Sequence, residues 1–275
     1  MKAAKPCPLN ARGDTPLQRA ARASSNAVMT DQPEIPDLSG KIALVTGASR
    51  GIGRAMAISL AKAGAHILAM ARTPGGLEEL DDEIRAIGGT ASLIPMDLAD
   101  GEAIARLGPA LAGRFPKIDI FLGNAAVLGE LTPITDIAEK IWNATLDINL
   151  TANWRLLKTL DPLLRASGAA RVAFITSTTG GEVARPFWGG YAISKAALEM
   201  LAKTYALETK IAGIRVAIIN PGPMRTKMRA QAMPGEDPMT LPEPEELTPL
   251  LYYAVDPAYD GDAERLIFKE WKSRT

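Results

Sequence analysis

Tyr191 and Lys195 stand four positions apart in a stretch with a helical pattern, so their side chains lie on one helix face, one turn apart. A nearby ammonium lowers the pKa of a phenol, whose reference value is about 10, and makes it usable as an acid and base near neutral pH. A tyrosine and a lysine at this spacing are common on wet helix surfaces. The pair therefore indicates proton-transfer chemistry only together with a second signal.

A glycine-rich turn supplies that second signal. Thr46-Gly47-Ala48-Ser49-Arg50-Gly51-Ile52-Gly53 follows the first apolar run of the chain and precedes a helical pattern. Glycine lets the backbone turn tightly and approach a pyrophosphate, which the amides at a helix N-terminus then stabilise. Because the turn and the Tyr–Lys pair occur in one chain, the sequence predicts chemistry on a nicotinamide cofactor.

Short apolar runs alternate with longer helical patterns from residue 41 onward. Runs of strand length lie at 42–45, 66–70, 92–94, 118–122, 172–175, 216–219 and 266–268, and helical patterns lie at 52–63, 77–87, 102–112, 137–164 and 192–211. Strands buried on both faces and joined by helices form a parallel, doubly wound sheet. We expect a single α/β domain of the Rossmann type, with about seven strands and helices on both faces. Ligands of such sheets bind at the carboxyl ends of the strands, and the motifs fall there.

Composition narrows the function classes. The 275 residues carry 31 basic and 31 acidic side chains, so no overall field favours nucleic acid or an anionic membrane. No apolar run approaches the ~18 residues that span a bilayer. The single cysteine, Cys7, excludes an intrachain disulfide, and a reducing, cytoplasmic location fits best. We expect no metal site.

Residues 1–38 differ in composition from the rest of the chain. Five prolines and five basic side chains occur there without an apolar segment. This pattern predicts a disordered N-terminal extension over residues 1–38 and a catalytic domain over residues 39–275. An organellar leader is an alternative interpretation of the basic residues, and Met29 is a candidate natural start.

The motifs together resemble the short-chain dehydrogenase/reductase family. Thr-Gly-x-x-x-Gly-x-Gly is followed by Asn124-Ala125 and then by Ser177 ahead of Tyr191-x-x-x-Lys195, so the resemblance covers residues 40–268. Gly123 and Ala126 depart from the Asn-Asn-Ala-Gly that the family usually shows. The run from Asn220 to Ala230, followed by Gly-Glu-Asp-Pro, resembles a bacterial subgroup of uncharacterised oxidoreductases and names no substrate.

The resemblance implies a catalytic group of four residues. Ser177 would hydrogen-bond the substrate oxygen, and Tyr191 would donate a proton to it or take one in the reverse direction. Lys195 would lower the pKa of Tyr191 and bind the nicotinamide ribose. Asn149 would hold a water in the proton relay, and it is also a polar residue able to kink its helix. Ser177 precedes Tyr191 by 14 positions, which indicates an enlarged loop.

The resemblance also implies the cofactor contacts. Members that prefer NAD place an acidic residue where Ala71 stands, whereas Arg72 with Arg50 suits the 2′-phosphate of NADP(H). We expect NADP(H) to be preferred over NAD; the competing interpretation makes both arginines solvated surface charges. Further contacts are implied for Gly47, Ser49, Gly51, Ile52 and Gly53 in the turn, for Asp97 and Leu98, for Asn124 and Ala125, for Pro221, Gly222 and Thr226, and for Tyr191 and Lys195. A turn aspartate is the simpler interpretation of Asp97.

The residues around the catalytic group suggest an apolar substrate pocket. Phe187 and Trp188 precede Tyr191, and Met224, Met228 and Met233 form a flexible apolar set that suits a lid. Ordinary packing is the simpler role for these methionines.

The expected function is an NADP(H)-dependent oxidoreductase, such as a carbonyl reductase, that transfers a hydride between nicotinamide and a carbonyl or alcohol substrate. Two alternatives stay open: a non-catalytic NAD(P)-binding regulatory or scaffold protein, and an epimerase or dehydratase on the same fold. The resemblance further implies a homodimer or homotetramer built through the helices at 137–164 and 192–211. Neither the substrate nor the direction of the reaction follows from the sequence.

Overall fold

The computed structural model describes residues 35–273. Most of the predicted extension, with Cys7 and Met29, therefore lies outside the described residues. Leu38, which the sequence assigned to the end of that extension, is buried, and its backbone amide donates to the carbonyl of Ala63 at 2.8 Å. The packed part of the chain thus includes Leu38, one residue before the predicted boundary.

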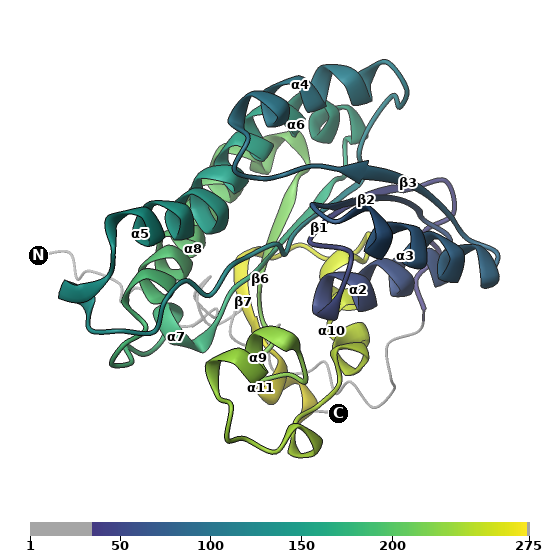
Figure 1. Ribbon diagram of the computed structural model, residues 1–275. Coiled ribbons are helices and arrows are strands. Elements are labelled where there is room, and N and C mark those ends of the chain that lie inside the picture. The colour runs from purple at the N-terminus through teal and green to yellow at the C-terminus, as the bar shows by residue number, and fades with distance from the viewer. Residues whose placement is uncertain (1–34, 274–275) are drawn as a thin grey trace, which may run out of the picture.

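Seven parallel strands form one sheet (Figure 1). In chain order they are β1 (Ile42–Thr46), β2 (His66–Ala71), β3 (Thr90–Pro95), β4 (Ile120–Gly123), β5 (Arg171–Ile175), β6 (Arg215–Asn220) and β7 (Asp262–Ile267). Their spatial order is β3-β2-β1-β4-β5-β6-β7, so the order reverses between β1 and β4. The predicted doubly wound parallel sheet is confirmed.

Helices cover both faces of the sheet (Figure 1). One face packs on α2 (Gly51–Lys62), α3 (Pro74–Ala86) and α10 (Thr248–Val255), and the other on α4 (Gly101–Ala112), α6 (Ala152–Ser167) and α8 (Gly189–Thr209). Shorter helices are α5 (Glu139–Leu146), α7 (Thr178–Gly181), α9 (Lys227–Ala232) and α11 (Phe268–Lys272), with 3₁₀ turns at Ile134–Asp136, Lys210–Ala212, Pro238–Thr240 and Pro244–Leu247.

The central strands are apolar throughout because both of their faces are covered. In β1, Ala43 and Val45 pack with the α2 layer, whereas Leu44 packs with the α6 layer, and all three are fully buried. This alternation within an unbroken apolar run is the pattern of a parallel strand between two helical layers. The sequence could therefore predict β1 almost to the residue.

Two predicted elements have different bounds in the structure. The helical pattern at 137–164 is divided by a π-helical turn, η2 (Asp147–Thr151), closed by a hydrogen bond from the Ala152 amide to the Asp147 carbonyl. The last strand, predicted at 266–268, begins at Asp262, and Phe268 already belongs to α11. A strand at the sheet edge has one side toward solvent, so its polar half carries no unbroken apolar signal.

Candidate active site

The carboxyl ends of β1 and β4 meet where the strand order reverses. Thr46, the last residue of β1, is buried, and its hydroxyl donates to the Leu122 carbonyl at 3.2 Å. The same hydroxyl accepts hydrogen bonds from the amides of Asn124 (3.0 Å) and Ala125 (3.1 Å). The Asn124 side chain donates in turn to the Thr46 carbonyl at 2.8 Å. These bonds fix the glycine turn against the end of β4.

The glycines of the turn are required by the backbone and by close packing. Gly47 and Gly51 have φ values of 66° and 55°, in the left-handed region that favours glycine. A Cβ at Gly53 would lie 2.3 Å from the Gly47 carbonyl oxygen and 2.4 Å from the Asn124 amide nitrogen. The turn therefore leads directly into α2, whose N-cap, Arg50, makes no side-chain capping bond and whose first turn has no acidic residue. Such a helix N-terminus suits a bound phosphate.

Thr226, in the segment between β6 and α9, lies against the glycine turn. A Cβ at Gly51 would meet the Thr226 methyl group at 3.5 Å. Thr226 is the N-cap of α9 and accepts a hydrogen bond from the Arg229 amide at 3.2 Å. Gly222, between β6 and Thr226, has a φ of 67°. The segment after β6 that carries Pro221 therefore reaches the predicted pyrophosphate site.

The two arginines predicted to bind a 2′-phosphate are exposed, and a hydrogen bond joins the two segments that carry them. The Ala48 amide, next to the turn, donates to the Met70 carbonyl at the end of β2 at 3.1 Å. Arg50 and Arg72 each follow one of these residues by two positions. Neither guanidinium has a hydrogen-bond or ion-pair partner within residues 35–273, so both are available to an anionic ligand.

Asp97 and Leu98 lie in the loop between β3 and α4. Asp97 is exposed and accepts a hydrogen bond from the Ala99 amide at 3.0 Å, which makes it a turn aspartate; Leu98 is buried against the α6 layer. The N-cap of α4 is Asp100, which accepts from the Ala103 amide at 2.9 Å.

Tyr191 lies near the start of α8, close to the serine that follows β5. Burial raises the pKa of the Tyr191 phenol, and a hydrogen bond with the Ser177 side chain acts in the opposite direction. The Trp188 ring contacts the phenol edge-on, with centroids 5.9 Å apart. Tyr191, Trp188, Leu128, Met228 and Ala232 form one apolar cluster, so part of the expected lid, α9, covers the phenol.

Lys195 is fully enclosed one turn further along α8. Its ammonium donates to the Ile175 carbonyl at 2.8 Å and lies 5.7 Å from the centroid of the Tyr191 ring. Burial lowers the pKa of Lys195 to about 8, and the carboxylate of Glu199 acts in the opposite direction. In this structure the pKa of Tyr191 is raised overall, so the expectation that Lys195 lowers it stays a prediction. The ammonium is bonded to a carbonyl, and removal of the phenol from water is the largest effect on its pKa.

Asn149 lies in the π-helical turn η2 and is completely buried. Its side-chain oxygen accepts from the Val127 amide at 2.8 Å, and its side-chain nitrogen donates to the Val127 carbonyl and to the Ser194 hydroxyl, both at 2.9 Å. The Ser194 hydroxyl donates to the Tyr191 carbonyl at 2.7 Å. Asn149 thus connects the loop after β4 to the helix that carries Tyr191, and its role in a water relay stays a prediction.

Sequence reasoning missed two residues that hold this site together. Glu199, four positions after Lys195, was detectable from helical spacing alone. Arg265, on β7, gave no signal because its contacts with Glu182, Glu199 and Ser177 arise from segments far apart in the sequence.

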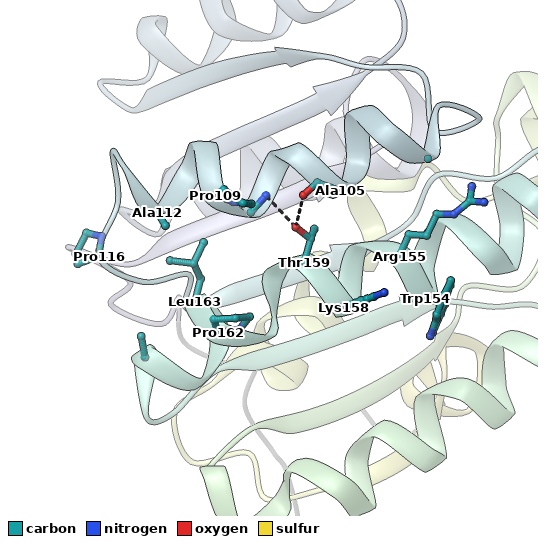
Figure 2. A pocket seen from close by; sticks show the side chains of 13 residues that line it. Ala105, Pro109, Ala112, Pro116, Trp154, Arg155, Lys158, Thr159, Pro162 and Leu163 are labelled. Carbon is teal, nitrogen blue, oxygen red and sulfur yellow. Dashed lines mark hydrogen bonds between the residues drawn. The ribbon is translucent and has the colours of Figure 1, made fainter.

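A cavity of about 710 Å³ lies away from this site, between α4 and α6 (Figure 2). Arg155, Lys158 and Trp154 lie toward one end, and Pro116, Ala112 and Leu163 toward the other. None of the predicted site residues lines it. Across the described part of the chain, no helix is long and apolar enough to span a membrane. No three His, Cys, Asp or Glu side chains within residues 35–273 cluster as metal ligands.

The chain belongs to the short-chain dehydrogenase family, whose model matches residues 41–237. It is similar to the uncharacterised oxidoreductase YciK of Escherichia coli K12, with 35% identity over 222 residues that cover 80% of this chain and 87% of YciK. It is also 32% identical, over 204 residues, to an uncharacterised NAD-dependent oxidoreductase of Mycobacterium tuberculosis; the match covers 70% of this chain and 74% of that protein.

Solved structures agree with this assignment. A short-chain dehydrogenase from Escherichia coli CFT073 in complex with NADPH superposes with a TM-score of 0.81 at 32% identity, covering 86% of this chain and all of that one. The protein is therefore a short-chain dehydrogenase/reductase, and the predicted resemblance, fold and enzyme class are confirmed.

Proposed function

We propose that the protein is an NADP(H)-dependent oxidoreductase that interconverts a carbonyl compound and an alcohol, with Tyr191 as the general acid and base. The observation that carries this proposal is the buried Tyr191 phenol beside the Ser177 side chain, one helical turn from a fully buried Lys195. A buried lysine costs stability. That cost favours catalysis over the alternative of a non-catalytic scaffold.

The residues present suit a dinucleotide. No side chain of the N-cap Arg50 bonds the amides that begin α2. Gly47, Gly51 and Gly53 leave the turn without Cβ atoms at these positions. Arg50 and Arg72 carry no ion pair in the described structure, and no acidic side chain stands at Ala71. A 2′-phosphate would be attracted there, and the NADPH complex of the Escherichia coli relative agrees with this preference. NAD remains the alternative, as the name of the mycobacterial relative indicates.

The chain's own residues supply the proton chemistry. NADPH, when bound, supplies a hydride to the carbonyl carbon. Ser177 donates a hydrogen bond to the carbonyl oxygen, and Tyr191 gives that oxygen its phenolic proton, so the product is an alcohol. The Lys195 ammonium, below its pKa of about 8, stabilises the phenolate that remains. The apolar cluster of Trp188, Leu128 and Met228 excludes water beside the phenol.

The first experiment follows NADPH absorbance across aldehydes, simple ketones, 3-oxo esters and quinones. Tyr191→Phe should lower turnover of any accepted substrate about 10²- to 10⁴-fold, because it removes the transferred proton, and should leave NADPH affinity within about twofold. Tyr205→Phe, on the same helix but paired with Asp161, is the matched control. Unchanged turnover in Tyr191→Phe would exclude the proposed acid; product analysis separates reduction from epimerisation or dehydration.

The cofactor preference has its own test. Replacing Arg50 and Arg72 together with alanine should raise the NADPH dissociation constant about 10- to 100-fold, because two charge-assisted contacts are lost. The NADH dissociation constant should change less than about twofold. Arg85→Ala, which removes an exposed arginine of α3 that pairs with Asp81, serves as the control. Equal losses for the two cofactors would contradict recognition of the 2′-phosphate.

A further inference from the structure

The backbone of Ser177 is held by a side chain from the edge strand of the sheet, β7. The Thr176 amide donates to the Ile219 carbonyl at 2.8 Å, and the chain then leaves β5. The Ser177 carbonyl accepts a hydrogen bond from the guanidinium of Arg265 at 2.9 Å. Two cations thus hold the end of β5, because Lys195 donates to the Ile175 carbonyl two residues earlier.

Arg265 reaches this carbonyl from the edge strand β7. Its side chain is 18% exposed, and its guanidinium pairs with Glu182 at 2.9 Å and with Glu199 at 3.4 Å. The Glu199 side chain is 6% exposed and follows Lys195 by one turn of α8. Asn220, at the end of β6, donates to Glu182 at 3.2 Å and to the Thr178 hydroxyl at 2.9 Å.

The loop after Ser177 leaves room for the side chains of Arg265 and Glu199. A Cβ at Gly181 would lie 2.2 Å from an Arg265 nitrogen and 2.4 Å from a Glu199 oxygen. The backbone at Gly181 is not in the left-handed region, so space alone requires glycine there. The loop therefore closes over the Arg265–Glu199 pair.

We propose that Arg265 is a positioning residue that, through the Ser177 carbonyl, sets the place of the Ser177 hydroxyl beside Tyr191. This inference rests on the proposed function. Arg265 lies beyond residues 41–237, the part that the family model matches. A guanidinium is a planar fork, so that of Arg265 donates to the Ser177 carbonyl while its charge pairs with the two carboxylates; a lysine ammonium is a point charge on a flexible stem.

Three variants separate geometry from charge. Arg265→Met removes the fork, Arg265→Lys retains the charge between Glu182 and Glu199, and Gly181→Ala displaces the pair without changing any charge. Each should lower kcat about 10- to 100-fold, because misplacement of a catalytic group on the order of 1 Å has effects of this size. KM and the NADPH dissociation constant should stay within about twofold. Arg106→Met, which removes an exposed arginine of α4, is the matched control.

A second measurement does not need the substrate. The five tyrosines, labelled with ¹³C at Cζ, give resonances of which Tyr191 is assigned by its loss in Tyr191→Phe. The Ser177 hydrogen bond lowers the phenol pKa. In Arg265→Met and Gly181→Ala the Tyr191 resonance should therefore titrate at higher pH than in the wild type, while the other four resonances show the same pH dependence as in the wild type.

The outcomes distinguish this inference from the proposed function. A wild-type protein that reduces no carbonyl refutes the function, and the Tyr191 titration still tests the placement. Wild-type kcat and an unshifted Tyr191 titration in the variants would overturn the positioning role. So would equal changes at all five tyrosines with a lower Tm, which indicate a structural role only. If Arg265→Met does not fold, Arg265→Lys and Gly181→Ala decide the question.

Discussion

Lys195 is the residue whose environment departs most from its behaviour in water. The side-chain amine of Lys195, which carries a proton in water, is enclosed between α8 and the end of β5. Its hydrogen-bond partner there is the Ile175 carbonyl. The pKa of Lys195 falls to about 8 because burial disfavours the ammonium, and Glu199 limits that fall. The lysine is therefore charged at neutral pH at a cost to the stability of the fold.

Burial of the Lys195 ammonium should make the free energy of unfolding depend on pH. The folded pKa of about 8 lies below the ordinary value of 10.5, so the unfolded chain binds more protons between these two values and stability rises with pH. Between pH 7 and pH 9.5 the wild type should gain about 2 kcal/mol of free energy of unfolding relative to Lys195→Met. Urea denaturation of both proteins measures this difference. Parallel pH profiles would contradict a depressed pKa.

Residue types and spacing predicted which residues belong to the candidate site, but they did not predict the direction in which the pKa of Tyr191 is shifted. Tyr191, Lys195 and the glycine turn were identifiable because helical periodicity and local backbone geometry are encoded over a few positions. The direction of the Tyr191 pKa was not, because it depends on burial by side chains such as Leu128 and Met228, which pack there from other elements. Arg265 escaped prediction for the same reason.

At the scale of elements, the contact between α2 and the end of β4 is the tightest part of the cofactor site. Replacing Gly53 with alanine would place a methyl group against the Gly47 carbonyl and the Asn124 amide, and the Asn124 side chain is held by its hydrogen bond to the Thr46 carbonyl. We expect Gly53→Ala to lower the free energy of unfolding by about 1–3 kcal/mol and to weaken NADPH binding at least tenfold. Gly75→Ala in α3, where nothing lies within 4 Å, should do neither.

Thermal denaturation and NADPH titration of the two glycine variants decide this prediction. A Gly53→Ala protein that binds NADPH as the wild type does would show that α2 shifts without consequence for the cofactor.

The central strands and the glycine turn were predictable because their signals are local. The π-helical turn was not, since its extra residue leaves the apolar spacing on either side intact.

At the scale of the whole molecule, α8 carries apolar side chains on its outer face. Met200 and Leu207 are exposed, as are Ile211 in the 3₁₀ turn that follows α8 and Trp154 on the neighbouring α6. An exposed apolar face on adjacent helices is typical of a protein–protein interface. We expect the chain to associate with a second copy through this face, as the sequence analysis proposed.

Two charge substitutions test the expected association. Met200→Glu and Leu207→Glu should convert a dimer or tetramer to a monomer at micromolar concentration, because each would bury an unpaired carboxylate. Met239→Glu, an equally exposed methionine away from α6 and α8, should leave the assembly unchanged. Sedimentation velocity measures all three. A wild-type monomer would contradict the interface.

The π-helical turn at Asp147–Thr151 has a consequence for how the gene tolerates change. The turn absorbs one residue more than an α-helix would place there, so a chain shortened by one residue there would form an uninterrupted α-helix with α5 and α6 keeping their faces. Such a single-codon deletion would keep Thr145 beside the loop at Gly129, whereas a deletion in the middle of α6 would rotate one half of that helix by about 100° against the other. The π-helical turn is therefore the place in this helical stretch where a change of one codon disturbs the flanking faces least.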